Sequence, residues 1–150
     1  MVESTIRFRT TSHVSSVVFA HAPDLVIWRS GTNDVAWGGR PDQRLKSSVL
    51  EGVRSLKAGS TDVVLMDLQY APRVLASASY STMEGIIADV AKQERVGLFS
   101  RFALMRNSIN AGVAQSELVS WDGLHNTADG LHWSPCPSHL NEPLRPLQRG

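Results

Sequence analysis

The sequence predicts a layered α/β sandwich built around a parallel sheet. Three short apolar runs, at residues 24–30, 61–67 and 96–99, have the length and composition of strands, and amphipathic helical patterns separate them. Strands that alternate with helices of this length pair in parallel through right-handed crossovers. A chain of 150 residues is long enough to bury the core of one such domain.

The first strand follows the end of a predicted helix at residues 15–22, which Pro23 closes. Its apolar run continues to Ser30 and leads into a Gly-Thr-Asn-Asp turn. A continuous apolar pattern of this kind predicts a strand that is covered on both faces.

A long amphipathic helix is predicted from Asp42 to Gly59. Five apolar side chains recur there at helical spacing: Leu45, Val49, Leu50, Val53 and Leu56. The second strand follows at residues 61–67. The loop after it, residues 68–79, is long enough to line a pocket at the sheet edge.

Ser81 and Glu84 predict a capping box at the start of the next helix. The buried face of that helix carries four apolar side chains: Met83, Ile86, Ile87 and Val90. The third strand and a helix at residues 102–114 come next. Four of the seven prolines then lie between positions 135 and 146, and proline interrupts a helix. We therefore expect an α/β domain at residues 1–130 and an irregular, proline-rich tail at residues 131–150.

Two short motifs carry candidate chemistry. Gly31-Thr32-Asn33-Asp34 places a side-chain amide just beyond the carboxyl end of the first strand, where open α/β sheets bind ligands. Asp122-Gly123-Leu124-His125 places a carboxylate three residues before an imidazole, so one turn can hold both. Occurring in this order, the two motifs resemble those of the SGNH (GDSL) hydrolases, and the resemblance covers roughly residues 17–130.

The resemblance implies a fold and a site. The fold is a flavodoxin-like three-layer sandwich of the SGNH type, of which only the last three strands are recognisable here, so we expect it to be incomplete. The activity is ester hydrolysis by a serine nucleophile, with His125 as base and Asp122 as the acid that orients it. Asn33 is the implied oxyanion donor, Gly31 lets the backbone pass closely, and Asp34 supports the turn.

The resemblance also bears on partners and cofactors. It implies a small-molecule ester as substrate and requires neither cofactor nor metal. A missing central strand would leave an unpaired apolar sheet edge, through which the chain is expected to self-associate.

The nucleophile is not assigned. The family places its serine in a Gly-Asp-Ser block, which this sequence does not contain, and neither Ser12 nor Ser30 has that context. We therefore expect the chain alone to hydrolyse simple esters no faster than a His125→Ala variant. The alternative function is that of a non-catalytic α/β remnant or binding module that has lost its nucleophile.

Each motif also has a purely structural interpretation. Gly-Thr-Asn-Asp is common turn chemistry. Asp-Gly-Leu-His occurs a second time at residues 129–132, and we prefer the first copy because it lies closer to the helix after the third strand. Four large apolar side chains are expected in the core or a pocket wall: Trp28, Met66, Met83 and Trp121.

A metal site is the less favoured alternative at the carboxyl end. His125, His132 and His139 recur at a regular interval with Cys136 among them, but the spacing matches no standard zinc motif and prolines interrupt the helix that would align it.

The amino-acid composition excludes several other kinds of partner and location. Fifteen basic and fourteen acidic residues leave a formal charge of +1 without a basic cluster, which argues against nucleic acid as a partner. The single cysteine excludes an internal disulfide. No apolar run approaches the ~20 residues of a membrane span or forms a signal-peptide core. The expected location is the cytoplasm, while export of a longer form is left open.

Overall fold

A computed structural model describes residues 23–128 and residue 130. Its elements follow one another along the chain as β1 (Leu25–Arg29), α2 (Thr32–Ala36), α3 (Gln43–Ala58), β2 (Asp62–Met66), α4 (Pro72–Leu75), α5 (Tyr80–Glu94), β3 (Gly97–Phe99), α6 (Arg101–Asn110) and α7 (Gln115–Leu118). The predicted helix end at residues 15–22 and the predicted tail at residues 131–150 lie outside the described residues.

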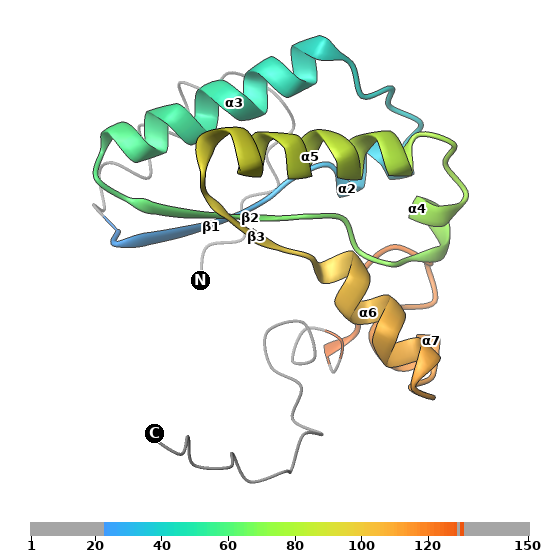
Figure 1. Cartoon of the computed structure of the whole chain (residues 1–150). Coiled ribbons are helices and arrows are strands. Elements are labelled where there is room, and N and C mark those ends of the chain that lie inside the picture. Colours follow the sequence, from blue (N-terminus) through green and yellow to red (C-terminus); the bar gives the residue numbers. More distant parts are fainter. Residues whose placement is uncertain (1–22, 129, 131–150) are drawn as a thin grey trace, which may run out of the picture.

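The described strands form one parallel sheet in the order β1-β2-β3. Helices α3 and α5 lie side by side against one face of it, while α2, α4 and α6 lie at the end where the strands finish (Figure 1). The predicted α/β class and the alternation of elements are therefore confirmed. Because all three strands run in the same direction, their carboxyl ends meet at one edge of the sheet.

The core lies between the sheet and the two long helices. Val63 and Leu65 of β2 point into it, and the buried side chains of α3 and α5 cover them: Val49, Val53, Leu56, Met83, Ile87 and Val90. The helical stripes predicted from the sequence are those that pack here, because burying them on the sheet removes them from water.

The prediction that β1 is covered on both faces is wrong. Val26 and Trp28 pack on the core, but the alternating residues Leu25 and Ile27 are 51% and 57% exposed. Within the described part of the chain, β1 pairs only with β2 and so occupies an edge. An apolar run does not distinguish a central strand from an edge strand whose other face is open. Self-association through this edge stays a prediction.

The two long helices begin differently. The Asp42 carboxylate caps α3 by accepting hydrogen bonds from the backbone N–H groups of Arg44 and Leu45 at 3.0 Å. The capping box at Ser81 and Glu84 is wrong, because α5 begins at Tyr80. Its N-cap residue, Ser79, instead donates its hydroxyl to the carbonyl of Gly39 at 3.0 Å. That contact ties the start of α5 to the segment after α2.

The predicted core positions are confirmed for Met83, which is fully buried, and for Trp28, which packs on the core. Met66 is half-buried. Trp121 is the exception, being 99% exposed. It lies in the loop that carries the Asp-Gly-Leu-His motif rather than in a core-facing element.

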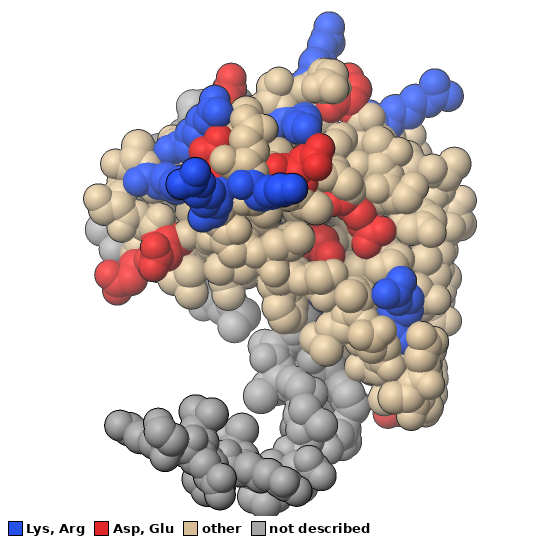
Figure 2. All heavy atoms as spheres, in the orientation of Figure 1, with Lys and Arg blue, Asp and Glu red and all other residues tan. Residues whose placement is uncertain are grey.

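The outer surface of the two long helices is charged. Lys46 pairs with Asp89 and Arg54 with Glu94, at 2.9 Å in each case. Figure 2 shows Lys and Arg side chains gathered over this layer with Asp and Glu among them. Both signs of charge are therefore interspersed on this face, as on an ordinary solvated helix layer. From Pro23 to Ala128, no helix has the length and apolar character needed to cross a bilayer.

Two helical glycines provide a matched test of this packing. A methyl group at Gly52 in α3 would overlap the indole of Trp28, whereas one at Gly85 in α5 meets nothing within 4 Å. We expect Gly52→Ala to lower the free energy of unfolding by about 1–3 kcal/mol through overpacking. Gly85→Ala should raise it by about 0.5–1 kcal/mol through helix propensity. Urea unfolding measures both, and a shift of the same sign in the two variants would contradict this packing.

Candidate active site

Both candidate motifs lie at the edge where the strands end. Gly31 to Asp34 follow β1 directly, and the turn at Asp122–His125 is attached to α4, which follows β2: the backbone N–H of Arg73 donates to the carbonyl of Gly123 at 3.1 Å. The prediction that the two motifs share one sheet edge is thereby confirmed. That the Asn33 and His125 side chains face each other across a cleft stays a prediction.

The Asp122–His125 pair is built into a single turn. One carboxylate oxygen of Asp122 accepts hydrogen bonds from the backbone N–H groups of Leu124 and His125, both at 3.0 Å. The other oxygen lies 2.5 Å from Nδ1 of His125. Gly123 has φ 71°, the left-handed conformation that favours glycine, and so permits the tight turn. The geometry is therefore encoded locally.

The surroundings of this turn hold it against the body of the domain. Leu124 is buried in the core, and the backbone N–H of Ser120 donates to the carbonyl of His125 at 2.7 Å. Val119 and Asn126 form an antiparallel bridge across the turn. The imidazole itself remains 75% exposed. A histidine bound to a carboxylate through Nδ1 leaves Nε2 free to accept a proton, as a general base requires.

The hydrogen bond from His125 is the main reason why the pKa of Asp122 falls to about 2, and the two backbone N–H groups act in the same direction. The carboxylate thus stays ionised at neutral pH. A permanently ionised partner is what an imidazole needs when it becomes an imidazolium.

The turn at Gly31 requires glycine for two reasons. Its φ is 88°, and a side chain there would lie 2.7 Å from Cγ of Met83 and 3.1 Å from Cδ2 of Leu68. The backbone at Gly31 therefore passes close to the core. Asn33 follows as the exposed residue of the first turn of α2, and among the described residues no hydrogen bond engages its side-chain amide.

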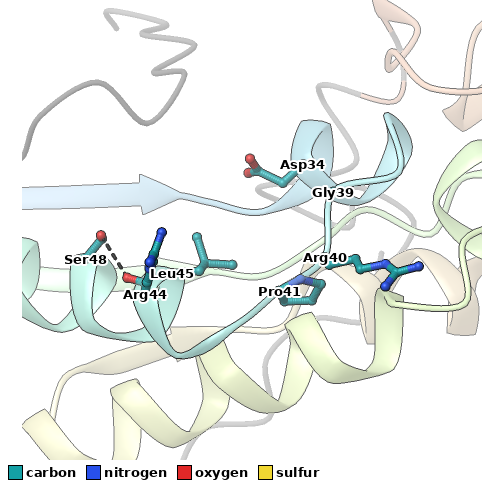
Figure 3. Close-up of a pocket in the computed structure, with 7 residues that line it drawn as sticks. All are labelled: Asp34, Gly39, Arg40, Pro41, Arg44, Leu45 and Ser48. Carbon is teal, nitrogen blue, oxygen red and sulfur yellow. Dashed lines mark hydrogen bonds between the residues drawn. The ribbon is translucent and has the colours of Figure 1, made fainter.

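Asp34 lies on a different surface. It borders a pocket of about 230 Å³ between α2 and α3, which Arg40 and Arg44 also line. Figure 3 shows the Asp34 carboxylate and the Arg40 guanidinium pointing apart. Burial raises the pKa of Asp34, and a hydrogen bond with its own backbone opposes that rise. The Asp34 carbonyl accepts the N–H of Gly39 at 2.6 Å, and the supporting role of Asp34 in the turn stays a prediction.

The sequence patterns did not predict a buried polar cluster at the carboxyl ends of β2 and β3. The buried carboxylate of Asp67, just after β2, accepts the Ser100 hydroxyl at 2.7 Å and the backbone N–H of Phe102 at 2.9 Å. The next residue, Arg101, is 1% exposed and donates from Nη2 to Oγ1 of Thr32 at 3.2 Å. The available signal was the position of Asp67 and Ser100 directly after apolar strands, where polar side chains gather at the edge.

The surroundings of Arg101 lower the pKa of its guanidinium. Burial lowers the pKa of Arg101 to about 9, nearby Arg29 acts in the same direction, and Asp67 opposes the change. Its Nε is buried without a hydrogen-bond partner in the described part of the chain. The guanidinium is thus an incompletely satisfied buried cation.

The described residues supply no nucleophile for the pair. Across residues 23–128 no side-chain hydroxyl hydrogen bonds to the His125 imidazole, and Ser30 is buried at the end of β1. Ser12 lies outside the described residues. No group of three or more His, Cys, Asp or Glu side chains within the described ranges could hold a metal ion. The histidines and the cysteine of the alternative metal site, His125 excepted, lie outside those ranges.

Comparison with known proteins identifies the fold. No protein-family model matches the sequence, and no curated protein matches it either. Among solved structures, the acetylxylan esterase Axe2 from Geobacillus stearothermophilus is similar, with 16% identity and a TM-score of 0.65 over 83% of this chain and 64% of its own. TesA has 22% identity and a TM-score of 0.64, over 83% of this chain and 65% of its own.

A GDSL-like lipase from Bacteroides thetaiotaomicron is also similar, with 20% identity and a TM-score of 0.54 over 83% of this chain and 66% of its own. The chain therefore has the parallel α/β fold of the SGNH-type hydrolases, as the sequence predicts. It spans less than two thirds of the length of these three proteins.

The Axe2 structures include three variants described as catalytic, in which a serine, an aspartate, or a histidine three positions after that aspartate is replaced by alanine. A fourth variant replaces the tryptophan directly before that aspartate. These roles belong to Axe2.

The hydrogen bond between Asp122 and His125 can be tested by titration. A lowered carboxyl pKa stabilises the fold above the unfolded-state pKa of about 3.9, and this contribution is lost as the pH falls from about 4 to about 2. We expect the Asp122 carboxyl ¹³C resonance to titrate near pH 2 in the parent. In His125→Ala its midpoint should move upward, because the largest cause of the shift is gone. Equal midpoints in the two proteins would show that the bond does not form.

Proposed function

We propose that this protein is an ester hydrolase of the SGNH type, with Asp122 and His125 as its acid–base pair. The observation that carries the proposal is the preformed contact between the Asp122 carboxylate and Nδ1 of His125, held at the carboxyl edge of an SGNH-type sheet. Trp121, Asp122 and His125 have the same order and spacing as three positions replaced in Axe2 variants: a tryptophan, the aspartate directly after it and the histidine three positions further on.

The proposed reaction begins with attack of a serine hydroxyl on the ester carbonyl. Nε2 of His125 takes the hydroxyl proton, and the Asp122 carboxylate stabilises the imidazolium that forms. The carbonyl oxygen becomes an oxyanion, for which the Asn33 amide is the proposed donor, worth about 3 kcal/mol. His125 then returns the proton to the leaving alcohol. Water attacks the acyl-enzyme by the same route and releases the acid.

The proposed substrate is a small-molecule ester. The exposed His125 imidazole and the exposed Asn33 favour a substrate that approaches from solvent over one that enters an enclosed cavity. The similar structures support esters as a class, since they are described as an acetylxylan esterase and a GDSL-like lipase. A cytoplasmic location remains part of the proposal.

The second candidate function is a non-catalytic remnant or binding module. It is favoured by one observation, the lack of a Gly-Asp-Ser block anywhere in the 150 residues. An imidazole with its carboxylate cannot form an acyl-enzyme without a nucleophile.

Hydrolysis of p-nitrophenyl acetate decides between the two candidates. The hydrolase predicts that the parent is fastest, that Asp122→Asn is slower, and that His125→Ala loses about 10²–10⁴-fold in rate, since that is the contribution of a positioned base. Ser12→Ala and Ser30→Ala would then identify the nucleophile. Equal rates in the parent and His125→Ala, which the missing block predicts for the chain alone, would contradict the hydrolase and support the remnant.

A further inference from the structure

The buried guanidinium of Arg101 contacts the turn that carries Asn33 from behind. Arg101 opens α6, and its Nη2 donates to Oγ1 of Thr32 at 3.2 Å although the two residues are 69 positions apart. Thr32 is buried and directly precedes Asn33. The contact therefore links the end of β3 to the turn after β1.

The position of Arg101 is itself fixed by the neighbouring strand. The Asp67 carboxylate holds both the Ser100 hydroxyl and the N–H of Phe102, which are the residues on either side of Arg101. The other side of the Asn33 turn is fixed by Gly31, which packs closely against Met83 and Leu68. Thr32 thus lies between Gly31, which packs closely against the core, and the buried Arg101 guanidinium.

The stability of the fold does not account for this arginine. Its Nε has no partner among the described residues, and a buried cation with so few hydrogen bonds is a weak contributor to stability. What the guanidinium does provide is a hydrogen bond to the turn that presents the Asn33 amide.

We propose that Arg101 is a positioning residue, which acts through Thr32 to hold the Asn33 amide in place for the developing oxyanion. The catalytic part of this inference rests on the proposed function. An oxyanion exists only in the transition state, so a loosened donor lowers kcat and leaves KM nearly unchanged. Loss of an entire oxyanion donor costs about 10²–10³-fold in kcat, and a misplaced one should cost at least about 10-fold.

The test uses three variants of the full chain. Arg101→Met removes the cation, and Thr32→Val removes its acceptor at nearly constant shape. Thr61→Val is the matched control, because Thr61 is also buried beside a strand and donates its hydroxyl to the carbonyl of Pro23 at 3.1 Å, away from the Asn33 turn. Arg101→Lys keeps a cationic donor and is expected to restore part of the effect.

The first readout is amide hydrogen exchange, which needs no activity. The N–H groups of Val35 and Trp37 donate to the carbonyls of Gly31 and Asn33 at 3.0 Å and so report on the turn. We expect both to exchange at least about 10-fold faster in Arg101→Met and in Thr32→Val, but not in Thr61→Val, because only the local opening free energy changes. The double variant should exchange no faster than either single variant. Unchanged rates, or equal acceleration throughout α3 and α5, would overturn the proposal.

The second readout is the kinetics of ester hydrolysis. In an active parent we expect kcat to fall in Arg101→Met and Thr32→Val with KM nearly constant, and the fall to vanish in an Asn33→Ala background. Unchanged kcat in an active enzyme refutes the role of Arg101 while leaving the hydrolase intact. A parent no faster than His125→Ala refutes the hydrolase, and the exchange rates then still decide whether Arg101 holds the turn.

Discussion

The buried carboxylate of Asp67 is the contact on which the arrangement of the sheet edge depends. It follows β2, accepts two hydrogen bonds from the first turn of α6 after β3, and thereby brings Arg101 to Thr32 after β1. Parallel pairing brings three strand ends to one edge, but it does not fix the loops beyond them. The Asp67 carboxylate, which follows β2, holds the start of α6, and the Arg101 guanidinium in α6 holds Thr32. The motif after β1 is therefore held by groups that follow the other two strands.

The Asp122–His125 turn depends on different physics. The three hydrogen bonds of the Asp122 carboxylate join residues at most three positions apart, so the geometry of the acid–base pair is determined locally. The flanking residue Ser120, the buried Leu124 and Arg73 of α4 hold the turn on the domain. This explains why a well-formed acid–base pair coexists with an imidazole that is exposed.

The sequence predicts those features that local periodicity or turn chemistry determines. The apolar stripe of α3 and the turn at Gly31 are of this kind, and both agree with the structure. The failures concern tertiary contacts. Leu25 is exposed because, among the described residues, α3 and α5 cover only the opposite face of the sheet, and α5 starts at Tyr80 with Ser79 bonded to the carbonyl of Gly39. Both features depend on residues that lie far away along the chain, so local sequence patterns do not predict them.

Arg101 is the clearest case of a residue whose burial and contacts the sequence does not predict. An arginine at the start of a helix is ordinarily solvated, and only its placement between β3 and the turn after β1 buries it. The candidate site therefore divides in two. The groups proposed to meet substrate were identified from short motifs, whereas the groups that hold one of those motifs were not.

The most direct test of this account is the distance between the side-chain amide nitrogen of Asn33 and Nε2 of His125 in a crystal structure of the full chain. Both groups are proposed to serve one reacting carbonyl, which must lie about 3 Å from each donor or nucleophile. The account predicts that they face a common cleft at a separation on the order of 6–8 Å, which leaves room for the carbonyl and a serine hydroxyl. Side chains that point to opposite sides of the edge, or that a packed element separates, would contradict it.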